Sequence, residues 1–313
     1  MASGPGRACP ASYGYGARAL DRRAELEVET LWVAGGLYGN PFALERLLEL
    51  YEREPRSKAL VFNGDFHWFD VQASQFRAIQ SSVLKFIALR GNVETELASP
   101  AEGAGCGCGY PDWVDDGTVT RSNAILEKLR ATAMQIPHAT AALAALPMHL
   151  VAEVGGVRVA VVHGDADSLA GWGFSQEALA TAQGAEAARR AFEQAGVGVF
   201  ASSHTCLPVL QEVRGGGLIA NNGAAGMPNF RGTRFGLATR ISVSPFGGSL
   251  YSKKAKGLHV EAVALDCDHA AWERCFLAQW PAGSAAHRSY HERIVHGPRY
   301  RLDQALRGAA LAA

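Results

Sequence analysis

Short apolar runs alternate with longer amphipathic segments along most of the chain. The short runs are rich in β-branched residues and end in Gly, Asn or His, a pattern typical of buried strands. We predict such strands at residues 30–35, 58–64, 83–89, 157–164, 197–202, 207–213 and 217–222. Two later runs, at residues 235–243 and 258–265, indicate further strands.

Apolar residues recur at helical spacing in several longer segments. The first segment opens with Pro41, which is tolerated in the first turn of a helix because its missing N–H would have no partner there. The predicted helices cover residues 41–54, 122–136, 176–195 and 269–280. Strands and helices alternate in the first two hundred residues, and mostly strands follow. This order predicts a layered α/β or α+β sandwich rather than a doubly wound sheet.

Three regions frame or interrupt this pattern. We expect an irregular N-terminal arm over residues 1–28 and one main domain over residues 29–265. Within that domain, residues 99–121 carry five glycines and two prolines, which predicts a long loop insertion. Residues 266–313 predict a C-terminal helical extension packed on the same domain. The apolar stripe expected to bury this extension consists of Trp272, Phe276 and Trp280.

The composition limits the classes of protein and partner. The 313 residues include 30 Lys and Arg against 30 Asp and Glu, without a block of five like charges. Nucleic-acid-binding proteins usually carry a basic excess, so no nucleic acid is indicated as a partner. The first thirty residues lack an apolar signal segment, and the most apolar stretch, residues 138–154, is interrupted by Pro147 and His149. We therefore expect no membrane span and a cytoplasmic location, while the oligomeric state stays open.

Four polar side chains stand at or just beyond the ends of predicted strands: Asp65, Asn92, His163 and His204. Taken alone, an Asp or Asn after glycine is typical of a turn, and a single His at a strand end is usually a hydrogen-bonded structural group. The carboxyl ends of strands in an open α/β sheet meet at one edge, where ligands bind. The recurrence of potential ligands at such ends therefore points to one shared site.

Six short motifs, most of them carrying these residues, follow one another in a characteristic order. They are GGLYGNPFAL, NGDFHW, LRGNVE, VVHGD, SSHTC and NNGAAGMPNFRG. In order and spacing they resemble the calcineurin-like metallophosphoesterases, and most of all the small bacterial phosphodiesterase-like branch, over about residues 28–265. The resemblance implies a two-layer β-sandwich flanked by helices, two metal ions at the strand ends and a metal-activated hydroxide that attacks phosphorus.

The resemblance also implies one complete set of metal ligands. Asp65, Asn92, His163 and His204 match the second metal position of the family residue by residue. Two oxygen and two imidazole ligands suit Mn, Zn or Fe, with water completing the shell. The expected cofactor is therefore a divalent transition metal, with one ion bound and a second left open.

The ligands of the first metal position are mostly missing. The Asp-x-His of the family stands here as Gly36 and Tyr38, and the second His of its GHTH motif is Cys206. Three outcomes follow: this position is empty, or Cys206, Tyr38 and His67 act as substitute ligands, or the scaffold has lost its metal altogether. Gly36 also leaves space where a carboxylate would normally sit.

The general acid and the phosphate-binding residues are less well defined. Val93 stands where many relatives carry a His, as in a branch of the family with the pattern GN-x-Asp or GN-x-Glu. His67 and Glu94 are the candidates for protonating the leaving group, if they reach its oxygen; without a second metal, His67 is a local structural residue. Arg90 and Arg231 are candidates for binding the substrate phosphate, because guanidinium groups pair well with phosphate oxygens.

The glycine-rich insertion follows the Asn92 motif, so we expect it to arch over the site. Its Cys106 and Cys108 have C-x-C spacing, which is not the pattern of a zinc knuckle. The six cysteines of the chain are scattered, which favours reduced thiols, and the loop then is a flexible lid. A disulfide or a thiol–metal contact would instead make the loop part of the chemistry. Further candidate substrate contacts in the loop are Trp113, Asp115 and Asp116.

The function expected from these features is hydrolysis of a phosphate mono- or diester through a metal-activated water, at an atypical or mononuclear metal site. The partner is then a small phosphorylated substrate. The alternative is a non-hydrolytic metal protein or a ligand-binding pseudoenzyme derived from the phosphoesterase fold. The altered residues Gly36 and Tyr38 keep this alternative open.

Overall fold

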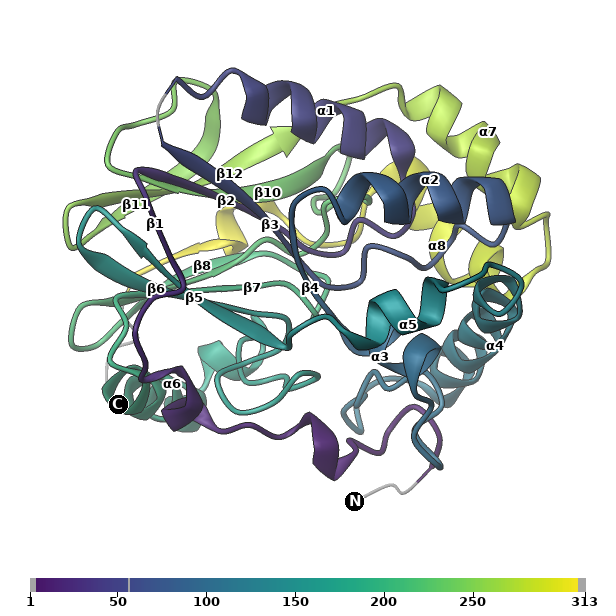
Figure 1. Ribbon diagram of the computed structural model, residues 1–313, viewed down its shortest axis with the longest axis horizontal. Helices are drawn as coiled ribbons and strands as arrows, with labels where there is room; N and C mark the ends of the chain where they lie inside the picture. Colours follow the sequence, from purple (N-terminus) through teal and green to yellow (C-terminus); the bar gives the residue numbers. More distant parts are fainter. Residues whose placement is uncertain (1–3, 56, 309–313) are drawn as a thin grey trace.

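Two β-sheets form the centre of the molecule, with helices on their outer sides (Figure 1). The computed structural model describes residues 4–55 and 57–308. Apolar side chains from both sheets share one core cluster between the two layers. The two-layer β-sandwich flanked by helices is therefore confirmed.

One sheet has six strands. Their order is β11 (Ser249–Ala255), β12 (Leu258–Leu265), β10 (Gly236–Ser242), β2 (Thr30–Ala34), β3 (Lys58–Asn63) and β4 (Ile87–Leu89). Strands β2, β3 and β4 run parallel, whereas β10 pairs antiparallel with both β2 and β12, and β11 pairs antiparallel with β12. The carboxyl ends of β3 and β4 therefore lie at the same edge.

The other sheet has seven strands. Their order is β1 (Leu26–Val28), β5 (His149–Val154), β6 (Val157–Val162), β7 (Val199–Ser202), β9 (Gly217–Asn221), β8 (Val209–Val213) and β13 (Leu306–Arg307). Strands β6, β7 and β9 run parallel, and the hairpins β5–β6 and β8–β9 are antiparallel. Strand β1 pairs in parallel with β5, and β13 pairs in parallel with β8.

Strand periodicity divides the side chains between the layers. In β2, Leu31 and Val33 belong to the core between the sheets, whereas Trp32 belongs to the cluster under the outer helices. In β6, Val161 faces the same inner core and Ala160 faces the opposite side. Successive side chains of a strand point to opposite faces, so a strand covered on both sides needs a continuous apolar run. This is why these strands are recognisable in the sequence.

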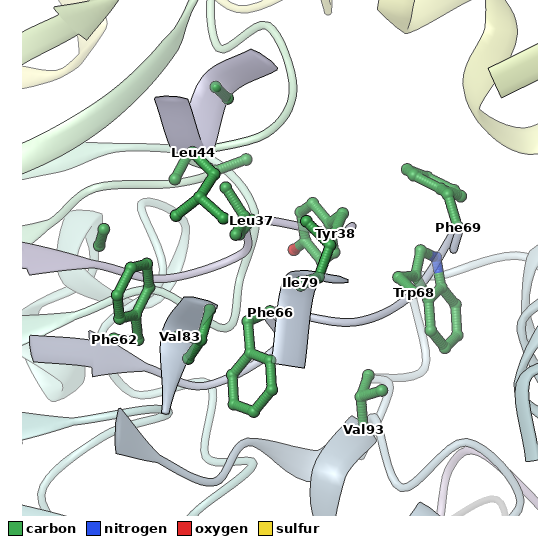
Figure 2. Packing of buried hydrophobic residues seen from close by; sticks show 14 of the residues in the cluster. Leu37, Tyr38, Leu44, Phe62, Phe66, Trp68, Phe69, Ile79, Val83 and Val93 are labelled. Carbon is green, nitrogen blue, oxygen red and sulfur yellow. The ribbon is translucent and has the colours of Figure 1, made fainter. Parts of the chain in front are cut away.

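Helices α1 (Pro41–Glu52) and α2 (Ala73–Val83) cover the outer face of the six-stranded sheet, and α7 (His269–Gln279) packs beside the end of α1 (Figure 1). The Asn40 side chain caps α1, because its Oδ1 accepts hydrogen bonds from the backbone N–H groups of Phe42 and Ala43. Figure 2 shows part of the apolar cluster under these helices, including Phe62 from the sheet and Ile79 from α2.

The remaining helices lie on the other face and at one end of the sandwich. Helix α6 (Ala182–Ala195) covers the outer face of the seven-stranded sheet. Helices α3 (Asn92–Ala98), α4 (Asp116–Ala133), α5 (Ala139–Ala144) and α8 (Ala285–His296) gather at one end (Figure 1). Short 3-10 helices are η1 (Ala11–Tyr13), η2 (Ala17–Leu20), η3 (Ala178–Ala180) and η4 (Leu302–Gln304).

Most of the predicted strands and helices are confirmed, and the differences have local causes. Residues 83–89 are not one strand, because Phe76, Ile79 and Val83 form the buried face of α2 and only Ile87–Leu89 is extended. The insertion ends at Asp115, whose side chain accepts a hydrogen bond from the Thr118 N–H and begins α4.

The C-terminal segment is not helical throughout. Helices α7 and α8 are followed by η4 and then by β13, which adds to the edge of the seven-stranded sheet beside β8. Across the described ranges, none of the helices is both long and apolar enough to span a membrane. The cytoplasmic location and the domain bounds expected from the sequence stay predictions.

Candidate metal centre

The four polar side chains from the strand ends meet in one buried cluster. Asp65 follows β3 and Asn92 begins α3 after β4, while His163 follows β6 and His204 lies just after β7. The Nε2 atom of His163 lies 3.4 Å from Asp65 Oδ1, 3.1 Å from Asn92 Oδ1 and 3.2 Å from His204 Nδ1. Each sheet thus contributes two residues. Their predicted meeting is confirmed, and their role as metal ligands stays a prediction.

Backbone carbonyls fix which nitrogen of each imidazole faces the cluster. A carbonyl oxygen only accepts, so Nδ1 of His163 donates to the Asn63 carbonyl at 2.8 Å. For the same reason Nε2 of His204 donates to the Cys108 carbonyl at 3.0 Å. The remaining nitrogens, Nε2 of His163 and Nδ1 of His204, turn their lone pairs toward the cluster. Metal-binding histidines are commonly oriented in this way.

Asn92 adds an oxygen to these acceptors. Its Nδ2 donates to the Cys106 carbonyl at 2.9 Å, which leaves Oδ1 facing His163. The ligand atoms of Asp65, His163 and His204 lie within 4.8 Å of one another. Acceptors that converge in this way need a cation, either a proton or a metal ion. A carboxylate, an amide oxygen and two imidazoles therefore fit a divalent transition metal.

Burial and neighbouring charge set the protonation of the cluster. Burial, together with the charge of His163, lowers the pKa of His204 to about 3. Burial also acts to lower the pKa of His163, but the charge and hydrogen bond of Asp65 outweigh it and raise that pKa. His163 in turn holds the pKa of Asp65 below its usual value, against the effect of burial. The cluster thus combines the carboxylate of Asp65 and the neutral imidazole of His204 with His163, where a positive charge is favoured.

Close backbone approach around Asp65 requires glycine on both sides. Asp65 itself has a φ of 53°, and its Oδ1 accepts from the Val93 N–H at 3.2 Å. A Cβ at Gly91 would lie 2.3 Å from Asp65 Oδ1, and a Cβ at Gly64 would lie 2.6 Å from His163 Nδ1. The glycines of the GD and GN motifs therefore allow the carboxylate and the imidazole to approach each other.

Glu94 holds the backbone around Asp65 in place through hydrogen bonds. It does not line the cavity, described below, that opens beside the cluster. Its buried carboxylate accepts hydrogen bonds from the N–H groups of Asp65 at 2.8 Å, Gly91 at 2.9 Å and His67 at 3.3 Å. Burial and the nearby charge of Asp65 raise the pKa of Glu94. With its oxygens engaged by the backbone, Glu94 is placed to hold the loop rather than to protonate a leaving group.

A cavity of about 150 Å³ opens beside the cluster. Aromatic side chains provide much of its wall. The residues that line it are Tyr38, Asp65, Trp68, Asn92, Val93, Cys108, Tyr110, Trp172, His204, Thr205, Cys206, Tyr290 and Arg293. The aromatic members from the insertion, from the loop after β6 and from α8 have no signal in the motifs.

The glycine-rich insertion arches over the cluster, as expected, because Cys108 and Tyr110 line the cavity. The Cys108 carbonyl also accepts from Trp172 Nε1 at 3.0 Å. The loop is tied down rather than free: the Cys106 N–H donates to Asn123 Oδ1 at 2.9 Å. A disulfide joins Cys106 to Cys108, so the expectation of reduced thiols is wrong for this pair.

The other loop residues proposed as substrate contacts do not line the cavity. Trp113 is 64% exposed and meets Trp172 edge-on, with ring centroids 6.4 Å apart. Asp115 caps α4, and Asp116 forms an ion pair with Arg7 at 2.7 Å. Trp113 therefore lies outside the cavity, in contact with Trp172.

Comparison with known proteins gives structural matches only. No protein-family model and no curated protein matches the chain. A hypothetical protein from Pyrococcus horikoshii OT3 is similar with a TM-score of 0.59 and 16% identity, over 87% of this chain and 99% of that one. A metallophosphoesterase from Sphaerobacter thermophilus is similar with a TM-score of 0.52 and 16% identity, over 87% of this chain and 100% of that one. The chain has the metallophosphoesterase fold.

Within this metallophosphoesterase fold, Tyr38 and Cys206 occupy the positions where the sequence lacks metal ligands. The Tyr38 hydroxyl and Cys206 Sγ lie 2.9 Å apart. A Cβ at Gly36 would lie 2.9 Å from the Tyr38 ring, so the expected free space beside Gly36 is filled by that ring. Tyr38 and Cys206 have φ values of 54° and 62°, which are strained for such side chains and are maintained by the surrounding packing.

Tyr38 and Cys206 are poorly suited to binding a second ion. Burial raises the pKa of Tyr38, and burial raises that of Cys206 although the charge of Arg293 acts in the opposite direction. Cys206 also lies outside the group formed by Asp65, His163 and His204. In this structure the polar atoms of the pair contact each other instead.

His67 is directed into the core and away from the cavity. Its Nδ1 lies 2.6 Å from Asp70 Oδ2, and its ring stacks on Phe76 with the centroids 3.7 Å apart. The side chain is fully buried and is not among the residues that line the cavity. This placement matches the structural role that the sequence left open for His67.

The arginines predicted to bind phosphate lie outside the cavity, and an unpredicted one lines it. Arg90 reaches the Ala144 carbonyl at 3.5 Å, and Arg231 is exposed. Arg293 of α8 instead extends to the cavity wall beside Cys206. The available signal was the spacing of Tyr290 and Arg293, which puts both on one face of a helix.

Proposed function

We propose that this protein is a metal-dependent phosphoesterase that hydrolyses a phosphate mono- or diester with a single divalent transition metal ion. The proposal rests on one observation above all. Four acceptor atoms, from Asp65, Asn92, His163 and His204, converge at the edge of both sheets, and all of these residues except His163 line the cavity of about 150 Å³. The metallophosphoesterase fold supports the same chemistry.

The residues of the chain would hold the ion and orient its ligands, and the ion would act as the electrophile. A divalent ion at this position would polarise a phosphoryl oxygen and lower the pKa of water. The carbonyls of Asn63 and Cys108 keep both imidazoles in the ligating tautomer. Trp172 and Tyr110 line the same cavity. Mn, Zn and Fe all suit this ligand set.

A second candidate is a non-hydrolytic metal protein or a ligand-binding descendant of the hydrolase. The specific observation in its favour is the contact between Tyr38 and Cys206, which fills the position of a second ion. Such a protein would bind the metal and a phosphorylated ligand without turnover. Activity measurements on the metal-loaded protein separate the two candidates.

The first experiment measures metal content by mass spectrometry on protein purified without chelator. We expect close to one ion per chain, and none in Asp65→Ala, His163→Ala or His204→Ala. His149→Ala is the matched control, because His149 lies in β5 of the same sheet and outside the cluster. Unmodified protein that binds no metal would contradict the proposal.

The second experiment measures turnover of bis(p-nitrophenyl) phosphate with added Mn or Zn. Activity should require the metal and should be lost in His163→Ala and His204→Ala but retained in His149→Ala. Full activity in the two cluster variants would show that the ligands are assigned wrongly. Metal binding without turnover would favour the second candidate.

A further inference from the structure

One guanidinium group reaches the wall of the cavity from the C-terminal part of the chain. Arg293 belongs to α8, whose Tyr290 lines the same cavity one helical turn earlier. Nε of Arg293 donates to the Pro228 carbonyl at 2.9 Å, and Nη2 donates to the Cys206 carbonyl at 2.7 Å. These two bonds fix the plane of the guanidinium group beside the cavity.

None of the described residues provides a counter-charge for Arg293. Among residues 4–55 and 57–308, no carboxylate lies within ion-pair distance of it, in contrast to Arg234, which pairs with Glu273 at 2.8 Å. Its two hydrogen bonds go to neutral carbonyls, and Nη1 makes none with a described residue. A fixed arginine without an anionic partner, at the wall of a cavity, is suited to an anionic ligand.

The position of Arg293 relative to the cluster indicates how that ligand is held. Arg293 contacts the backbone of Cys206, and the side chain of Cys206 contacts Tyr38, so the guanidinium lies on the side filled by this pair. Asp65 and His204 lie in the wall of the same cavity, of about 150 Å³. Of the described residues that line it, Arg293 alone carries a permanent positive charge.

We propose that Arg293 binds the non-reacting oxygens of the substrate phosphate, and thereby supplies the positive charge that a second metal ion would otherwise provide. This inference rests on the proposed function for its substrate, a phosphate ester. A guanidinium group presents parallel N–H donors that match two phosphate oxygens. Arg293 is therefore a substrate-binding residue of the cavity, and it replaces Arg90 and Arg231 in that role.

The test is calorimetric titration of inorganic phosphate into the Mn-loaded protein and into protein stripped with chelator. Hydrogen bonds to a charged group contribute about 1.5–3 kcal/mol, so Arg293→Gln should weaken phosphate binding by about 10- to 150-fold. The metal content should not change. Arg293→Lys keeps the charge without the paired donors and should give an intermediate affinity.

Arg234→Gln is the matched control, because Arg234 also ties a C-terminal helix to the sandwich but lies outside the cavity. It should bind phosphate as the unmodified protein does. Unchanged phosphate affinity in Arg293→Gln would overturn the inference. Arg293-dependent phosphate binding in a protein that holds no metal and hydrolyses no ester would support the anion site while refuting the proposed function.

A second measurement does not depend on a folded variant. Phenylglyoxal modifies accessible arginines, and peptide mass spectrometry reports the rate at each position. Phosphate should slow the modification of Arg293 in the unmodified protein and leave the exposed Arg231 unaffected. Equal rates at Arg293 with and without phosphate would contradict the inference.

Discussion

At the scale of single residues, the cavity contains metal-ligand groups but few usable proton donors. Glu94 is engaged by backbone N–H groups, and His67 is directed into the core. Burial raises the pKa of Tyr38 and of Tyr110, and it raises the pKa of Tyr290 to about 12. In the proposed hydrolysis, a leaving group would therefore depart without help from a good general acid.

This arrangement predicts a strong dependence on the leaving group. A general acid contributes about 10²- to 10⁴-fold, so an alkyl ester, which needs protonation, should react slower than an activated aryl ester by at least this factor. The measurement is turnover of a series of phosphate diesters, and its readout is the slope of the logarithm of the rate against the pKa of the leaving group. His67→Gln should leave the slope unchanged. A shallow slope that becomes steep in His67→Gln would identify His67 as the acid after all.

The same residues show what sequence can and cannot predict about a site. Asp65 and His163 were predictable because each follows a strand, and the ends of parallel strands converge. His67 was misleading because closeness in sequence to Asp65 says nothing about the direction of its side chain. Arg293 and Trp172 were missed because their approach to the site depends on how a distant helix and a long loop pack.

At the scale of elements, the glycine-rich insertion is held by contacts to its neighbours. Asn123 of α4 accepts from the Cys106 N–H at 2.9 Å, and it donates to the Pro5 carbonyl at 3.0 Å. One side chain thus joins the insertion, the N-terminal arm and α4. The insertion places the Cys108 carbonyl against His204, so its order affects the orientation of that imidazole.

Asn123→Ala should loosen the insertion specifically. It leaves the N–H of Cys106 without its partner, which costs about 1–3 kcal/mol for a buried group. Hydrogen exchange should become faster over residues 99–115 and metal affinity should decrease. Thr120→Ala, an exposed change on the same helix, is the control. Unchanged exchange in the insertion would show that the disulfide and Trp172 are sufficient to hold it.

A second connection between elements is a buried ionic cluster outside the candidate metal centre. Arg240 of β10 donates to Glu54 at 2.6 Å and to Glu261 of β12 at 2.7 Å. Burial acts to raise the pKa of Glu54, but the hydrogen bonds and charge of Arg240 outweigh it and hold the pKa below 4.5. The cluster joins the connection between α1 and β3 to the antiparallel half of the sheet.

This cluster should make stability depend on acid pH. A lowered pKa in the folded state means that the interaction stabilises above the ordinary pKa of 4.5 and is lost as the pH falls through the folded value. Removing one partner of a buried pair costs about 3–5 kcal/mol, so Arg240→Met should lower the free energy of unfolding at pH 7 by this order.

Urea unfolding of both proteins between pH 7 and pH 3 measures the effect. The difference between Arg240→Met and the unmodified protein should decrease below pH 4.5. Arg301→Met is the control, since its pair with Asp303 is exposed and screened by solvent. A difference that stays constant with pH would contradict the assigned role of Glu54.

At the scale of the whole molecule, the candidate metal centre lies across the two layers. Asp65 and Asn92 come from the ends of one sheet, and His163 and His204 come from the ends of the other. An ion bound by all four therefore joins the layers at one edge. Elsewhere the layers are held mainly by the apolar core between them.

Metal removal should therefore lower global stability and not only activity. A ligand at 100 times its Kd stabilises the folded state by about 2.7 kcal/mol. Thermal unfolding should occur at a lower temperature after chelation in the unmodified protein and in His149→Ala. Asp65→Ala should show no such shift. An equal shift in Asp65→Ala would mean that the stabilising ion binds elsewhere.

The last strand has a consequence for association between molecules. β13 is short, and it occupies the outer side of β8, which would otherwise present free N–H and C=O groups at a sheet edge. Open edges of this kind invite pairing with another chain. A protein cut before Leu306 would thus expose the outer edge of β8 and become prone to self-assembly through it.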